Sequence, residues 1–118
     1  MTREVSAGYD RAALPESYRV KLLPEEVQSG GVFHRLHRWL DQNMARFGFF
    51  RAYREYRGGM FSEAWHLSYA PISIPALEAL TVDVVAQALR DGDILGKELV
   101  LERLPEINQR HVLNISMP

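Results

Sequence analysis

Two residues near the middle of the chain have the types that hydrolytic metal chemistry uses. Glu63 and His66 lie three positions apart in the segment 62–69, which reads SEAWHLSY. A carboxylate can take a proton from water, and an imidazole can bind a metal that makes the water more acidic. The pair therefore matches a general base and one ligand of a zinc hydrolase, whose catalytic metal needs about three protein ligands. The spacing alone is a weak signal, since common polar residues often share it.

A predicted turn and strand surround this pair. Gly58 and Gly59 predict a turn, after which residues Ala64–Ala70 read as a strand that Pro71 closes. Residues an odd number of positions apart in a regular strand point to opposite faces, so Glu63 is expected to precede the regular part. The two side chains can then face the same cleft.

The rest of the chain predicts short helices and strands. Apolar residues follow helical spacing over 32–44. Within that helix, Phe33, Leu36 and Leu40 are expected to pack on a sheet that contains the 64–70 strand. Further strands are predicted over Tyr18–Leu22 and His111–Ile115, and further helices over Thr81–Leu89, with Thr81 as N-cap, and Asp93–Leu101. No repeat or linker divides the sequence, which indicates one α+β domain over residues 1–118.

The segment around the pair is similar to a family motif. The string SEAWHLSYAP at 62–71 resembles the Glu-x-Trp-His motif of the VanY-type zinc D-alanyl-D-alanine carboxypeptidases, relatives of the peptidoglycan-cleaving LAS metallopeptidases. Three earlier stretches resemble the segments that precede this motif in such enzymes: GGVF at 30–33, LHRWLD at 36–41 and FGFFR at 47–51. The resemblance implies the LAS fold, a small antiparallel sheet with packed helices, truncated at its N-terminus to the C-terminal part of the domain.

The resemblance also implies roles for the pair. In that family the Glu of the motif is the general base and the His is a zinc ligand, roles that would fall to Glu63 and His66. On residue type alone, His66 would be a structural histidine in a strand. The family's other ligands, a His and an Asp, belong to an upstream Ser-x-His-x-x-Gly-x-x-x-Asp type motif that this sequence lacks. Glu4 and Asp10 are weak candidates for the Asp, so the expected cofactor is zinc in an incomplete site.

The other candidate residues have plainer alternatives. His34 and His37 share a face of the predicted helix and could chelate a metal, but a solvated His34 and a packed His37 are the more common outcome. His111 begins a predicted strand. Trp65 and Tyr69 are candidates for binding substrate in a groove, although aromatic residues in a strand more often fill the core.

Composition indicates a globular protein. Of the 118 residues, 47% are hydrophobic and 25% are charged, as in ordinary folded domains. Fourteen basic and fifteen acidic residues nearly balance, which disfavours nucleic-acid binding. The absence of cysteine excludes disulfides, thiolate metal sites and cysteine nucleophiles. The longest apolar stretches fall short of the roughly 20 residues that span a bilayer.

Two functional hypotheses follow. The first is a zinc peptidase that removes the terminal D-alanine from a peptidoglycan stem peptide ending in D-Ala-D-Ala. The alternative is a noncatalytic module of that fold that binds cell-wall peptide or another partner. The resemblance implies the cell envelope or periplasm. Residues 1–8 lack the apolar core of a secretory signal, so the signal of an exported protein is expected upstream.

Overall fold

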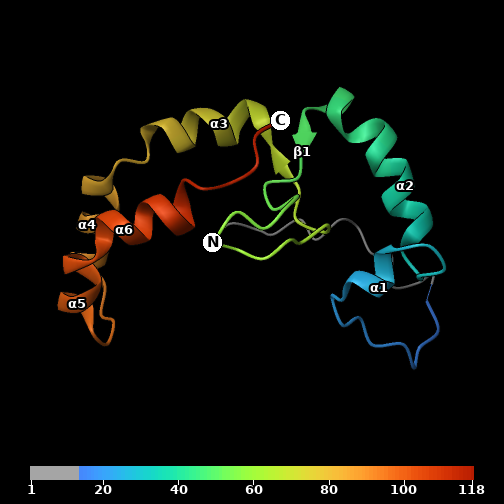
Figure 1. The fold of residues 1–118 in the computed structure, drawn as a ribbon, viewed down its shortest axis with the longest axis horizontal. Helices are drawn as coiled ribbons and strands as arrows, with labels where there is room; N and C mark the ends of the chain where they lie inside the picture. Colours follow the sequence, from blue (N-terminus) through green and yellow to red (C-terminus); the bar gives the residue numbers. More distant parts are fainter. Residues whose placement is uncertain (1–13) are drawn as a thin grey trace.

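Short helices form most of the structure, and a small sheet joins them. The computed structural model describes residues 14–118. Along these residues the chain forms α1 (Pro24–Val27), α2 (His34–Asn43), the 3-10 helix η2 (Met44–Phe47), β1 (Phe49–Phe50), β2 (Ser68–Tyr69), α3 (Ala70–Ala79), α4 (Val82–Asp91), α5 (Lys97–Glu102), α6 (Leu104–Ile107) and the π-helix η3 (Asn108–Val112). Figure 1 shows α1 and α2 on one side of the sheet and α3 to α6 on the other.

The sheet is antiparallel and very short. β1 and β2 pair with Phe49 opposite Tyr69 and Phe50 opposite Ser68. Gly48 leads into β1 with φ of 80°, a conformation that glycine adopts without strain. Within residues 14–118 this is the only sheet. The expected antiparallel sheet with helices is thus confirmed, but the structure is more helical than an α+β domain was expected to be.

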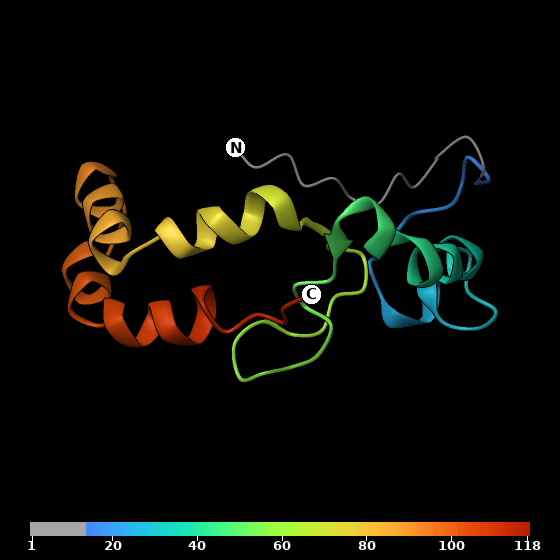
Figure 2. The ribbon, with the colours of Figure 1, turned by 90° about the horizontal axis from the view of Figure 1, so that it is seen from above.

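The helix predicted over 32–44 is confirmed as α2, which begins and ends slightly inside the predicted range. Leu40 is buried, and so is Phe33, the residue just before α2. The Phe33 ring meets the Tyr18 ring edge-on, with 6.4 Å between centroids. Leu36 is half-buried, whereas Trp39 stays 50% exposed. Because each strand has only two residues, α2 has no broad sheet to lie on, and Figure 2 shows it to one side of β1.

The strand predicted over Ala64–Ala70 is shorter than expected. Only the 68–69 pair forms β2, and Ala70 already begins α3. Pro71 stands in the first turn of that helix instead of closing a strand, because the N–H that proline lacks has no partner at that position of a helix. The expectation of a full strand was wrong for this reason.

Residues Tyr18–Leu22, predicted as a strand, form an irregular segment held by one carboxylate. Glu26 accepts hydrogen bonds from the Tyr18 hydroxyl at 2.6 Å and from the N–H groups of Lys21 and Leu23 at 3.0 Å each. Burial favours the neutral carboxyl, but these hydrogen bonds outweigh it and hold the pKa of Glu26 below its usual value. A side chain satisfies the backbone donors here, so no partner strand is needed and the strand prediction was wrong.

Residues 70–112, which we call the arm, contain the four helices α3 to α6 and η3. The helix predicted from Thr81 is confirmed as α4, and the Thr81 hydroxyl accepts from the Val84 N–H at 3.3 Å. The helix predicted from Asp93 begins only at Lys97, because Gly96 takes a left-handed φ of 71° just before it.

The strand predicted over His111–Ile115 was wrong. Residues up to Val112 continue the helical path of α6 as η3. The chain then returns to the loop after β1, where the Ser116 N–H donates to the Ala52 carbonyl at 2.8 Å. Gly59 allows the loop and η3 to meet, since a Cβ at this position would lie 2.2 Å from the Arg110 carbonyl oxygen.

Between residues 14 and 118, no helix by itself is long and apolar enough to cross a membrane. α3 and α4 reach the necessary length and apolar composition jointly, but the chain bends by 83° between them.

We expect Glu26→Ala to lower the free energy of unfolding by roughly 1–3 kcal/mol, because three donors lose a charged acceptor. Urea denaturation followed by circular dichroism measures this. The adjacent Glu25 is exposed, so Glu25→Ala is a matched control and should change little. Equal losses in the two variants would show that the Glu26 carboxylate does not organise the 18–23 segment.

Candidate active site

Glu63 and His66 meet in a tight turn just before β2. The Glu63 carbonyl accepts from the His66 N–H at 3.3 Å, and the Glu63 N–H donates to the Tyr53 carbonyl at 2.9 Å. Glu63 Oε2 is in direct contact with His66 Nδ1. The two side chains meet, and Glu63 precedes the regular strand, as expected. That they face an open cleft stays a prediction.

The pair is partly shielded from water. The Glu63 side chain is 24% exposed and the His66 side chain 28%, yet the two atoms that face each other are themselves inaccessible to solvent. The Tyr53 ring packs edge-to-face on the imidazole, with 5.4 Å between centroids. A carboxylate on one ring nitrogen sets the orientation and tautomer of an imidazole. The turn therefore presents His66 in one defined orientation.

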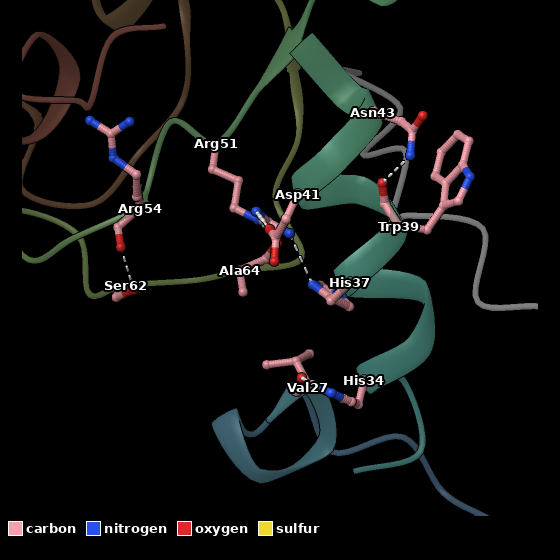
Figure 3. A network of polar contacts seen from close by, with 10 residues as sticks. All are labelled: Val27, His34, His37, Trp39, Asp41, Asn43, Arg51, Arg54, Ser62 and Ala64. Atoms are coloured by element: carbon pink, nitrogen blue, oxygen red, sulfur yellow. Dashed lines mark hydrogen bonds and ion pairs between the residues drawn. The ribbon is translucent and has the colours of Figure 1, made fainter. Parts of the chain in front are cut away.

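Arg51, directly after β1, connects this turn to α2. Its Nε donates to the Ala64 carbonyl at 2.7 Å, inside the 63–66 turn. Its Nη1 is paired with Asp41 and its Nη2 lies 3.2 Å from His37 Nδ1, both on α2 (Figure 3). Only 11% of the Arg51 side chain is exposed. One guanidinium thus holds α2 and the turn at a set distance.

His37 is the buried end of this network. Its side chain accepts from Arg51, which can only donate. Burial first, and the Arg51 charge second, lower the pKa of His37, while Asp41 acts in the opposite direction. The prediction that His37 packs and hydrogen-bonds in the protein is confirmed. His34, expected to be solvated, instead lies half-buried with Nδ1 at 3.2 Å from the Val27 carbonyl.

Arg51 and Asp41 were not among the sequence-predicted site residues. Each is the last residue of a stretch that carries the family resemblance: Arg51 of FGFFR at 47–51 and Asp41 of LHRWLD at 36–41. That was the available signal, but it does not say that the two side chains meet. Their contact depends on how α2 folds back on the loop after β1.

The two aromatic residues of the motif have different environments. Trp65 is 8% exposed and belongs to the core. Tyr69 is 41% exposed and its ring lies 5.1 Å from that of Phe49, between centroids. Tyr69 therefore offers a ligand more surface than Trp65 does, and a substrate role for either residue stays a prediction.

A complete zinc site does not form between residues 14 and 118, where no three His, Asp or Glu side chains converge. A catalytic zinc needs about three protein ligands. The pair supplies one imidazole, together with a carboxylate that is already in contact with it. Glu4 and Asp10, the candidates for the missing Asp, lie outside the described residues. The described residues by themselves therefore do not fit a catalytic zinc.

The segment that carries the pair matches a known family. The model of the family VanY, D-alanyl-D-alanine carboxypeptidase, matches residues 15–72. Over these 58 of the 118 residues the chain matches the VanY family. The VanY segment contains α1, α2, the sheet, Arg51 and the 63–66 turn, and it ends just inside α3. The motif resemblance seen in the sequence is confirmed.

Similarity to another protein extends beyond the VanY segment. A protein of Haemophilus influenzae, described as uncharacterized, is 26% identical over 107 residues, which cover 89% of this chain and 82% of the relative. A match of that length includes most of the arm. No solved structure matches the chain.

We expect Arg51→Met to lower the free energy of unfolding by roughly 1–3 kcal/mol, since Ala64, Asp41 and His37 all lose a charged donor. The same variant should shift the NMR signals of the His66 ring, because the turn loses its anchor. Urea denaturation and NMR measure the two effects.

Arg54→Met is the matched control for that experiment. Arg54 is exposed, and the contact that ties it to Ser62 uses its backbone carbonyl. If Arg54→Met moved the His66 signals as much as Arg51→Met, the loss of a positive charge, and not of the anchor, would be the cause.

Stability should fall as the pH drops below the ordinary histidine pKa of about 6.5. With the pKa of His37 lowered in the folded state, the unfolded chain binds a proton first, so acid favours unfolding down to the folded-state pKa. NMR titration of the His37 ring measures this directly. A titration midpoint at or above about 6.5 would contradict the assignment of His37 as a buried, neutral acceptor.

Proposed function

We propose that the chain carries the base-bearing part of a zinc-dependent D-alanyl-D-alanine carboxypeptidase type of peptidase that acts on peptidoglycan stem peptides. The observation that carries this proposal is the contact between Glu63 and His66 in a turn of the VanY segment. Membership of the family supports peptidase chemistry, and the position of the pair supports these two residues as its carriers.

Glu63 is proposed as the general base. Hydrolysis of the terminal peptide bond requires water to lose a proton as it attacks and the leaving amine to gain one. A single carboxylate can accept the first proton and deliver it to the amine of the departing D-alanine. The contact with His66 and the hydrogen bond from the Glu63 N–H to Tyr53 restrict where this carboxylate can lie. Such restriction favours catalysis, because little reorganisation is then needed.

His66 is proposed as one zinc ligand, with its ring oriented by Glu63. On this proposal the further ligands are not among residues 14–118, because no three His, Asp or Glu side chains converge there. Tyr69 is proposed to contact the stem peptide, with Trp65 behind it in the core. A peptidoglycan substrate supports a location in the cell envelope.

A noncatalytic module that binds cell-wall peptide is the second candidate. The ligand count favours it, because the described residues keep the base and one imidazole but do not complete a metal site. Zinc binding distinguishes the two candidates, because the peptidase needs zinc and a binding module does not.

We expect this chain alone to bind zinc weakly and to release little or no D-alanine from a stem peptide ending in D-Ala-D-Ala. Fusing an upstream segment with the Ser-x-His-x-x-Gly-x-x-x-Asp ligands of a VanY relative should add two ligands and confer both properties. Metal analysis and D-alanine release measure them. In the fused chain, His66→Gln should abolish zinc binding, whereas Glu63→Gln should keep zinc and lose turnover.

Glu55→Gln is the matched control, since Glu55 is an exposed carboxylate before the same turn. Turnover that survives Glu63→Gln would overturn the role of Glu63. Stoichiometric zinc with Glu63-dependent turnover in the unextended chain would mean that the ligands come from residues 1–13 or a second copy. Peptide binding without zinc or turnover in either chain would favour the noncatalytic module.

A further inference from the structure

The arm leaves apolar surface uncovered. Eight of the ten residues of α3 are apolar, all but Ser73 and Glu78, yet none of its residues is buried, and Ile72 is 69% exposed. Farther along, Val84 is 52% exposed, Leu99 60% and Leu95 fully. Single exposed apolar residues are ordinary, but a helix that is apolar all round is normally buried. The arm therefore has the composition of an element that another surface covers.

The shape of the molecule agrees with a missing neighbour. Its radius of gyration is 17.0 Å, whereas a compact domain of this length has about 13.5 Å. The arm and the part that contains α1 and α2 lie apart (Figures 1 and 2). They are joined at the sheet and at the loop after β1, where Arg110 Nε donates to the Gly58 carbonyl at 2.6 Å.

Charges that nearly cancel over the whole chain are separated between its two parts. Residues 14–57, which we call the lobe, hold eight Lys and Arg but five Asp and Glu, whereas the arm holds seven Asp and Glu but four Lys and Arg. All seven acidic residues of the arm are exposed, and so are all the basic residues of the lobe except Arg51. The two parts are electrostatically complementary.

The lobe also presents aromatic surface among its basic residues. Trp39 and Phe47 are each about half exposed and their rings stack at 6.2 Å between centroids. The Arg46 guanidinium lies 4.7 Å above the Phe47 ring, and Arg35 and Arg38 are exposed on the same helix as Trp39. We call these five residues the basic aromatic face. Exposed arginine and aromatic side chains are typical of protein interfaces.

We propose that the arm of one copy of this chain packs against the basic aromatic face of a second copy, in a two-fold dimer in which each copy gives its arm and receives the other. Apolar and acidic residues of the arm would then meet aromatic and basic residues of the lobe. The net negative charge of the arm argues against an anionic membrane surface as the occupant, because helices that bind such surfaces are rich in Lys and Arg. Two-fold pairing lets one complementary contact form twice.

Sedimentation equilibrium of the full chain at about 100 μM tests the proposal, since a micromolar dissociation constant would give mostly dimer at that concentration. We expect twice the monomer mass of 13.5 kDa. Leu99→Ser should raise the dissociation constant roughly tenfold or more, because burial of a leucine is lost. Phe61→Ser is the matched control, as Phe61 is 75% exposed and belongs to neither surface; it should leave the dimer intact.

A charge exchange makes the test specific for the two surfaces. Arg35→Glu with Arg38→Glu, and separately Glu98→Arg with Glu102→Arg, should each weaken self-association while circular dichroism stays unchanged. Mixing the two variants should restore dimers, because the reversed charges of one chain meet those of the other. A monomer at all concentrations, a dimer insensitive to Leu99→Ser, or a mixture that stays monomeric would overturn the proposal. Binding of a monomer to phosphatidylcholine and phosphatidylglycerol vesicles would also overturn it.

Discussion

The guanidinium of Arg51 is the contact on which the order of the lobe depends. It is almost excluded from solvent, and it meets a carboxylate, a neutral imidazole and a backbone carbonyl from two separate segments. A buried guanidinium without partners costs several kcal/mol, so all three groups must keep their positions together. Two of them belong to α2 and the third lies between Glu63 and His66. The geometry of the turn therefore depends on the position of α2, a helix that is distant from the motif in the sequence.

The contacts of the turn fix the orientation of the site residues, but they do not complete a metal site. The turn, the Tyr53 ring and the Arg51 contact define where Glu63 and His66 point. None of these contacts adds a metal ligand. A well-ordered carboxylate and imidazole can serve hydrolysis or simply stabilise a turn, and the number of further ligands decides which. The VanY segment therefore supports an enzyme family more directly than it supports activity of this chain alone.

The arm and the residues before it obtain their stability differently. Of the six buried apolar residues among positions 14–118, Phe33, Leu40, Phe50 and Trp65 surround the sheet and α2, while the arm buries only Ala86 and Leu104. A helical segment with so little burial has few contacts to oppose its conformational entropy. Covering the arm with a second surface would supply the missing burial. The separation of acidic arm and basic lobe indicates which surface that is.

The sequence by itself determined the elements whose signals are local. Helical spacing identified α2, Thr81 marked the start of α4, and the motif at 62–69 identified Glu63 and His66 as neighbours, because cap chemistry and short turns act within a few residues. Tertiary structure decided what depends on partners distant in sequence. Alternation at 18–22 and 111–115 suggested strands, but a strand forms only where a second strand accepts its hydrogen bonds; Glu26 took those of the first segment and η3 continued α6 into the second. The link from Arg51 to Asp41, His37 and Ala64 joins residues 10 to 14 positions apart, and it exists only because the folded chain brings a donor with a fixed geometry to three acceptors at once.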